Sequence, residues 1–198
     1  AHAITVEGDA YGNDFSPYYY ADGYWSNEFD GTDNLRFSNE DVFDLGGQDF
    51  TMECWVNPIA QGQYHLLIQK WDPPSNKTFA FQISNSNYIQ FVYTTNGSTN
   101  ASLTGSTAIP SGRWTHSSLT GTTAISAGTW THVAASRSGG TLKLFINGVA
   151  DATDSSFTAT LYNSSAVVTV GSDADNSNYT DAYISNARFI KGRGIYTS

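Results

Sequence analysis

Three acidic residues near the N-terminus, Glu28, Asp30 and Asp33, have the types and spacing that glycoside hydrolysis can use. Retaining glycosidases place two carboxyl groups about 5–5.5 Å apart, one as the nucleophile and the other as the acid and base. Glu28 and Asp30 would share one face of a strand, because side chains alternate along it. Residues 31–34 have turn composition and would take Asp33 off that face. We therefore expect a structural turn here, with catalysis as the distant alternative.

A second group of oxygen-bearing side chains lies in residues 171–181. Calcium prefers six to eight oxygen ligands from carboxylates, amides and carbonyls. The segment is not an EF-hand loop, because it lacks the central glycine and its twelfth position is Ile184 rather than glutamate. The alternative is an Asx-rich turn, since Asp and Asn favour loops without any ion. The candidate ligands are Asp173, Asp175, Asn176, Asn178 and Asp181.

Aromatic side chains beside polar groups are candidates for glycan binding. The C–H face of a sugar stacks on an aromatic ring, while its hydroxyls need oriented polar partners. The candidates are Trp71, then Trp114 with Arg113 and His116, and Tyr18, Tyr19 and Tyr20 near the start. The remaining tryptophans, Trp25, Trp55 and Trp130, are expected to pack within or between sheets.

Nucleophilic and zinc chemistry have little support in the sequence. None of the four histidines lies in a recognisable serine or cysteine elbow. Cys54 is the only cysteine, so no intrachain disulfide can form, and on the apolar face of a strand it acts as a small hydrophobe. His116 and His132 are equivalent positions of a repeat, and no third zinc ligand accompanies them.

Strands must position these side chains, because apolar residues alternate with period two and no helical pattern persists. In residues 50–57 one face carries Phe50, Met52, Cys54 and Val56. The other expected strands are 64–70, 78–84, 88–94, 130–136, 141–147, 167–171 and 183–190. Turns at 138–140 and at Asn147-Gly148 predict a hairpin over 130–146 and another after it. Many short strands without helices predict a two-sheet antiparallel sandwich or jelly roll.

One segment is duplicated: residues 104–119 align with 120–135 and are identical at nine of sixteen positions. After the shared Trp-Thr-His the second copy continues an apolar face with Val133 and Ala135, whereas the first offers Ser117 and Ser118. We expect the second copy to be the core strand, and the first, with Trp114, to form an added hairpin or loop near the surface.

Charge and composition exclude some partners. The chain has 198 residues, 18 Asp plus Glu against 9 Lys plus Arg, and a net charge of -9. A polyanion would be repelled, so we expect no nucleic-acid partner. No stretch approaches the roughly 20 apolar residues of a membrane span, so we expect no membrane insertion.

Five segments together resemble a known family: 29–31 (FDG), 50–58 (FTMECWVNP), 67–70 (LIQK), 128–134 (GTWTHVA) and 140–148 (GTLKLFING). Their order and spacing are similar to the laminin-G-like group of concanavalin A-like lectin jelly rolls. The closing segment 183–192 resembles that of such modules in phage tail and other virion proteins. The resemblance implies an all-β antiparallel two-sheet jelly roll over 24–198, with 1–23 packing on or leading into it.

This fold hosts lectins, adhesion modules, enzymes and structural pieces, so function depends on a site. We expect a non-catalytic surface recognition module that binds a cell-surface or extracellular glycan, with calcium as a candidate cofactor. The resemblance implies an extracellular location or a virion surface. The alternatives are a virion decoration protein that binds only protein neighbours and, more distantly, a family 16-like glycoside hydrolase.

Overall fold

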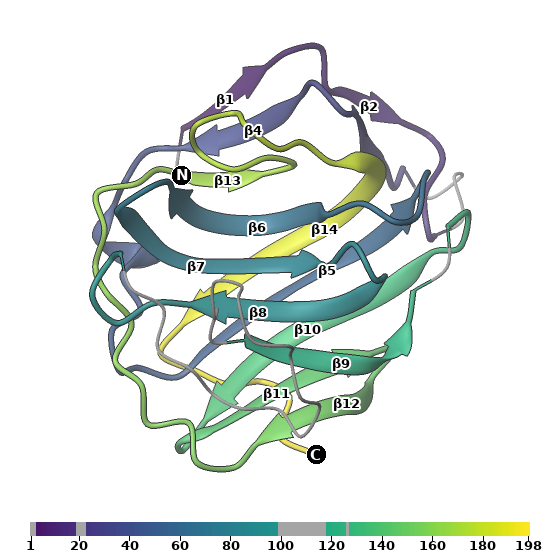
Figure 1. Cartoon of the computed structure of the whole chain (residues 1–198). Coiled ribbons are helices and arrows are strands. Elements are labelled where there is room, and N and C mark those ends of the chain that lie inside the picture. The colour runs from purple at the N-terminus through teal and green to yellow at the C-terminus, as the bar shows by residue number, and fades with distance from the viewer. Residues whose placement is uncertain (1–2, 19–22, 99–117, 126) are drawn as a thin grey trace.

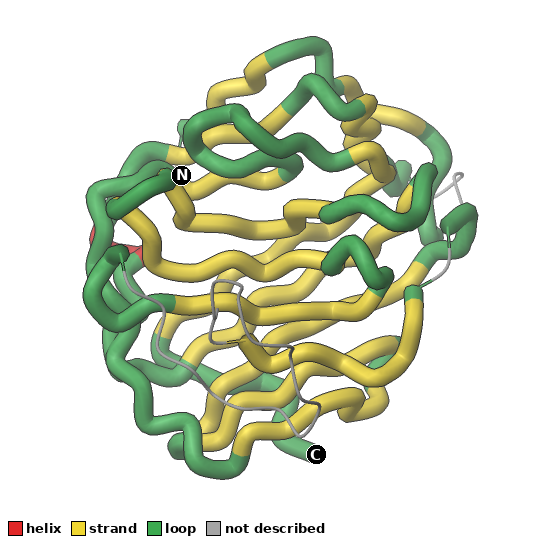
Figure 2. Tube along the Cα trace, in the orientation of Figure 1, coloured by secondary structure: helices red, strands yellow, loops and turns green. Residues whose placement is uncertain are grey.

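The computed structural model describes all residues except 1–2, 19–22, 99–117 and 126, and it is a sandwich of two antiparallel sheets (Figures 1 and 2). In spatial order the first sheet, here the β6 sheet, contains β1 (Ile4–Glu7), β4 (Asn34–Phe37), β13 (Val168–Val170), β6 (His65–Asp72), β7 (Asn76–Ile83), β8 (Tyr88–Tyr93) and β9 (Ser118–Ala124). The second, here the β5 sheet, contains β12 (Val149–Asp154), β11 (Thr141–Ile146), β10 (Thr131–Ser138), β5 (Phe50–Pro58), β14 (Asp181–Lys191), β3 (Ser26–Asp30) and β2 (Tyr11–Asn13). The predicted all-β jelly-roll sandwich is confirmed.

The core lies between the two sheets and follows the predicted alternation. Phe50, Met52, Cys54 and Val56 of β5 are fully buried. From the facing sheet Phe91 stacks on Phe50 with ring centroids 5.3 Å apart. Burial raises the pKa of the Cys54 thiol far above its ordinary value, so this cysteine is an inert part of the core.

The two predicted hairpins are present. β10 pairs with β11 in antiparallel register, and β11 pairs with β12. The first turn has φ of 56° at Gly139 and 83° at Gly140, and the second has 49° at Asn147 and 79° at Gly148. Positive φ at both central residues is the signature of the type I′ turn, whose twist matches that of the strands.

The segment that follows β2 and the segment that follows β14 both lie on the outer face of the β5 sheet, the face turned away from the core. After β2 the N-terminal segment crosses this face, where the Phe15 ring contacts Trp130 at 5.4 Å and Tyr183 at 5.0 Å. At the other end, the Ile195 N–H donates to Thr51 Oγ1 at 2.8 Å. The space between these two terminal segments is where the candidate site lies.

The tryptophans depart from the prediction. Trp25 precedes the first residue of β3 and is 61% exposed, so the prediction that it packs between sheets is wrong. Trp55 and Trp130 are half-buried, but their packing partners lie on the outer face of the β5 sheet rather than in the core. The Trp55 side chain faces outward because side chains alternate along β5, and its neighbours Cys54 and Val56 take the core side.

Candidate functional site

A pocket of about 430 Å³ opens on the outer face of the β5 sheet. This size lies within the roughly 300–1,000 Å³ typical of ligand sites. We call it the outer pocket. Its lining residues are Tyr18, Glu53, Trp55, His132, Asn186, Arg188 and Tyr196.

Strand register brings the lining together from three adjacent strands. In β5, Glu53 and Trp55 are two residues apart and therefore share a face. In β10, His132 pairs with Trp55, and the two rings lie 5.4 Å apart. In β14, Arg188 pairs with Glu53. Side chains far apart in the sequence thus meet in one small patch of sheet.

A β-bulge in β14 determines which side of the sheet Arg188 occupies. Ser185 pairs with Trp55, yet Arg188 pairs with Glu53, so β14 holds one residue more than β5 over this stretch. Asn186 at the bulge has φ of 52°, a left-handed conformation that asparagine tolerates better than most residues. Ile184 before the bulge is buried in the core, and the extra residue lets Arg188 face outward.

Glu53 is the hub of the polar groups in the pocket. Its Oε1 accepts hydrogen bonds from the Arg188 guanidinium, and its Oε2 accepts one from the Tyr196 hydroxyl. The His132 Nε2 lies 3.2 Å from the same Oε2. The side chain of Glu53 is only 9% exposed, whereas that of Arg188 is 52% exposed. Glu53 therefore acts as an anchor that fixes groups which can themselves reach a ligand.

Tyr196 closes one side of the pocket from the C-terminal segment. Its backbone N–H donates to Ser136 Oγ at 3.3 Å, and its ring contacts Phe145 at 5.5 Å and His132 at 6.0 Å. Burial and the hydrogen bond to Glu53 raise the pKa of the Tyr196 hydroxyl above its ordinary value. The hydroxyl is thus a neutral donor at physiological pH rather than a phenolate.

Among the described residues, Tyr18 is the one glycan candidate predicted from the sequence that lies in this pocket. Trp71 lies in β6 of the opposite sheet and is half-buried, with Lys77 Nζ 5.2 Å from the centre of its ring. Tyr18 does line the outer pocket, where its ring contacts Trp55 at 5.9 Å. Trp114, Arg113, His116, Tyr19 and Tyr20 lie outside the described residues.

The predicted calcium loop is held by hydrogen bonds of its own. The carboxylate of Asp173 is buried and accepts bonds from the backbone N–H groups of Ser177 at 2.8 Å and Asn178 at 3.0 Å. It also accepts from Ser177 Oγ at 2.9 Å and from Asn178 Nδ2 at 2.6 Å. A cation would compete with these four donors for the same oxygens. The geometry is that of the Asx-rich turn, the alternative to a calcium site in this loop.

The other proposed ligands in that loop face different partners. Asn176 Oδ1 accepts from Asn34 Nδ2 at 3.0 Å and lies 3.2 Å from the Arg36 guanidinium. Asp181 begins β14 and pairs with Asp30 of β3. These contacts link the loop to β3 and β4.

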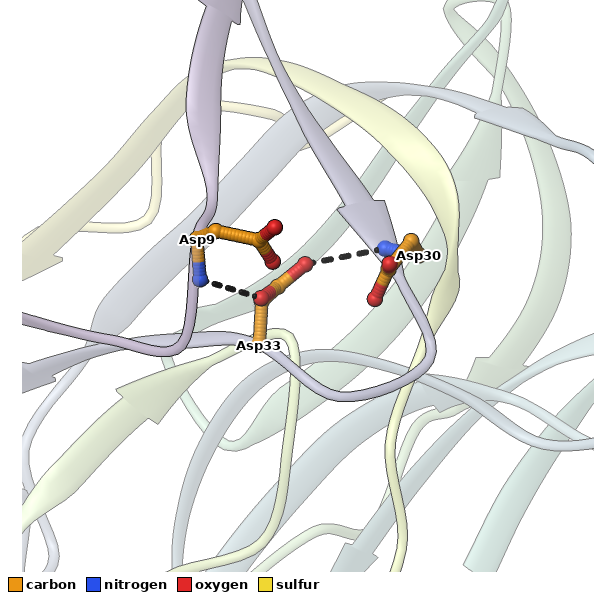
Figure 3. Close-up of side chains that lie close together, drawn as sticks. All are labelled: Asp9, Asp30 and Asp33. Carbon is orange, nitrogen blue, oxygen red and sulfur yellow. Dashed lines mark hydrogen bonds between the residues drawn. The ribbon is translucent and has the colours of Figure 1, made fainter.

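A cluster of three carboxylates lies elsewhere, at the turn after β3 (Figure 3). Within it, Asp33 is 1% exposed and accepts the backbone N–H groups of Asp9 at 2.8 Å and Asp30 at 3.0 Å. Oxygen ligands of this kind suit calcium. Both Asp33 oxygens already accept hydrogen bonds, however, and these tie the N-terminal segment to the turn.

The same turn decides the role of the acidic pair expected for glycoside hydrolysis. Asp30 Oδ1 accepts the backbone N–H of Thr32 at 3.1 Å and its hydroxyl at 2.7 Å, so Asp30 caps the turn. The Glu28 carboxylate accepts from the Tyr11 hydroxyl at 2.6 Å and from Asn13 Nδ2 at 2.8 Å. Neither residue lines the outer pocket. These contacts favour the predicted structural turn over a catalytic pair.

The sequence comparison assigns the family. A profile for the concanavalin A-like lectin/glucanases superfamily matches residues 29–121 and again 117–192. The two matches overlap inside the duplicated segment, as a family pattern lengthened by a tandem repeat would produce. The chain belongs to this superfamily. No curated protein sequence matches the chain.

Solved structures with the same fold include a domain of an arabinanase and the binding domains of a neurotoxin and of a mosquitocidal protein. Domain 4 of AbnA, an extracellular arabinanase from Geobacillus stearothermophilus, in complex with arabinotriose, has a TM-score of 0.58 and 16% identity, over 96% of this chain and 82% of that one. The binding domain of botulinum neurotoxin DC, in complex with SialylT, has a TM-score of 0.64 and 14% identity. The binding domain of Paraclostridial Mosquitocidal Protein 1 has a TM-score of 0.65 and 10% identity. Both of these alignments span 98% of this chain. They span only 44% of the neurotoxin chain and 45% of the mosquitocidal protein chain.

At such identities the likeness concerns the fold alone.

Among the described residues, no helix has the length and apolar character needed to cross a membrane.

Proposed function

We propose that this chain is a glycan-binding module without catalytic activity of its own, and that the outer pocket is its binding site. The observation that carries the proposal is the half-buried Trp55 ring beside a network of fixed polar groups around Glu53. A ring can stack on the C–H face of a sugar, and the polar groups can bond to its hydroxyls.

Preorganisation supports binding at this pocket. Arg188 is held by Glu53, so fewer side-chain rotamers are lost when a ligand arrives. The Tyr196 oxygen remains able to accept a hydrogen bond while its hydrogen points to Glu53. The exposed Asn186 adds an amide at the rim. Hydroxyl groups of a sugar, which both donate and accept, suit this mixture.

The same network supports binding over catalysis. A general acid or base needs a proton site that the substrate can reach. The Glu53 carboxylate is nearly buried and already accepts bonds from Arg188 and Tyr196. Tyr196 has a raised pKa, the opposite of what an activated nucleophile needs.

The similar structures add support of a general kind. The arabinanase domain is in complex with arabinotriose, and a further botulinum neurotoxin structure concerns interaction with two ganglioside molecules. We also propose an extracellular or virion-surface location. Support for the virion comes from the resemblance of residues 183–192 to closing strands of phage tail modules, and protein neighbours on such a particle remain the alternative partners.

A glycan array tests the proposal directly. The purified chain is applied to a broad array, once with millimolar calcium and once with a chelator, alongside the Trp55→Ala variant. We expect wild-type hits that Trp55→Ala loses. A blank array in both buffers would contradict the proposal and shift the function toward a decoration protein. Hits that Trp55→Ala retains would place the site elsewhere.

A further inference from the structure

The aromatic rings of the outer pocket continue into a longer row across the sheet. Starting from the N-terminal segment, the Tyr24 ring contacts Tyr18 at 4.8 Å, and Tyr18 contacts Trp55 at 5.9 Å. Trp55 contacts His132 at 5.4 Å, and His132 contacts Tyr196 at 6.0 Å. Five rings thus follow one another at similar spacings. We call them the ring row.

The ring row runs across the strands rather than along one of them. Trp55 belongs to β5, His132 to the neighbouring β10, and Tyr196 packs on Phe145 of β11. At the other end Tyr18 and Tyr24 are 39% and 45% exposed. The row is therefore open to ligand beyond the single pocket around Trp55.

A second, smaller pocket of about 160 Å³ extends the site past Tyr196. We call it the hydroxyl pocket. Its lining is Ser136, Ser138, Thr141, Lys143, Tyr196 and Thr197, so Tyr196 is shared by both pockets. Serine and threonine hydroxyls can donate and accept, which suits a further sugar unit.

In the outer pocket the charges of Glu53 and Arg188 are paired with each other. Lys143 in the hydroxyl pocket keeps its positive charge and donates to the Thr197 carbonyl at 2.7 Å. Binding a charged sugar in the outer pocket would remove its charge from water without an unpaired opposite charge to compensate. An uncharged ligand avoids this cost.

From this arrangement we propose that the module binds an uncharged, linear oligosaccharide that lies along the ring row, with one end in the hydroxyl pocket. This inference rests on the proposed function. It adds that several consecutive sugar units make contact, rather than one terminal sugar. Each unit in contact with a ring then contributes to affinity.

The test is a length series measured by isothermal titration calorimetry. The probes are arabino-, xylo- and cello-oligosaccharides of one to six units, with oligogalacturonides of matched length as the charged series. For the neutral series that binds, we expect affinity to rise roughly 2- to 10-fold per added unit up to about four units and then to level off.

Two end variants locate the ligand. Tyr24→Ala at one end and Lys143→Met at the other should weaken long ligands more than one- and two-unit ligands, and so reduce the gain in affinity per added unit. Trp55→Ala should weaken ligands of every length, and unchanged unfolding midpoints show that the variants are folded. Three outcomes would overturn this inference and leave the proposed function standing. They are an affinity that does not depend on length, end variants that weaken all lengths equally, and tighter binding of the charged series. If no series binds and the broad array is also blank, both the inference and the proposed function fail.

Discussion

Arg188 faces Glu53 across β14 and β5 only because β14 carries one extra residue between Ser185 and Arg188. In a regular strand, Arg188 would follow Ile184 toward the core, since side chains two residues apart share a face. The bulge therefore builds the ion pair and, through it, the polar half of the outer pocket. Bulges are common beside functional sites for this reason.

The conformation of Asn186 at the bulge gives a first prediction. Because its φ is 52°, a β-branched residue there is strained by about 1–2 kcal/mol. We expect Asn186→Val to lower the free energy of unfolding by that amount, measured by chemical denaturation. Asn186→Gly is the matched control and should lose much less. Equal losses for the two variants would contradict the strain expected for a β-branched residue at position 186.

Glu53 and Glu28 provide a matched pair of carboxylates on the β5 sheet. Glu53→Gln removes the charge that holds Arg188, and bonds to charged groups contribute about 1.5–3 kcal/mol. We expect glycan affinity to fall on the order of tenfold or more, measured by calorimetry. Glu28→Gln should leave affinity unchanged, because Glu28 bonds to Tyr11 and Asn13 outside the pocket. A larger effect from Glu28→Gln would point back to the acidic segment 28–33.

We expect His65 to make the stability of the fold depend on pH. Burial lowers its pKa below the ordinary value of about 6.5, although a hydrogen bond with the Ala60 carbonyl opposes this. The unfolded chain then binds a proton more readily than the folded chain does. The contribution of neutral His65 to the free energy of unfolding is therefore fully present above about pH 6.5, and it is lost as the pH falls toward the lowered pKa.

We expect the free energy of unfolding to decrease between pH 7.5 and 5.5, and His65→Gln to reduce that decrease. Denaturation curves at the two pH values measure it. His132→Gln, at a half-buried position in the outer pocket, is the comparison variant. An identical pH dependence in wild type and His65→Gln would show that His65 is not responsible.

The loop around Asp173 gives a prediction about calcium. Its carboxylate already accepts four hydrogen bonds, so we expect millimolar calcium to leave the unfolding midpoint and glycan binding unchanged. Thermal unfolding with calcium and with a chelator measures the first quantity. A calcium-dependent rise in the midpoint that Asp173→Asn abolishes would instead establish the calcium site predicted from the sequence.

The sequence predicted the core face of β5 and both hairpins because these depend on local patterns. Alternation fixed the inward side of residues 50–56, and positive-φ turn residues fixed the pairing of β10 with β11. The outer pocket depends instead on non-local features. Alternation along β5 also places Glu53 and Trp55 on its second face, but nothing local shows that terminal segments cover that face.

The bulge in β14 has one signature in the sequence, a change in the alternation of apolar residues. Apolar core residues fall at the even positions Ala182 and Ile184, then at the odd position Phe189, which packs against the core. Such a change of parity within one strand indicates an inserted residue. It would have predicted that Arg188 faces outward, opposite Glu53. The contribution of Tyr196 has no comparable signal, because its place depends on how the C-terminal segment packs.

The most direct test of the proposed site compares two half-buried tryptophans on opposite sheets. The strongest ligand from the glycan array is titrated into wild type, Trp55→Ala and Trp71→Ala. Removing a central aromatic contact weakens binding by about 2 kcal/mol or more, so we expect Trp55→Ala to lose roughly 30-fold in affinity and Trp71→Ala to match wild type. Loss of binding in Trp71→Ala with full affinity in Trp55→Ala would contradict the outer pocket as the glycan site.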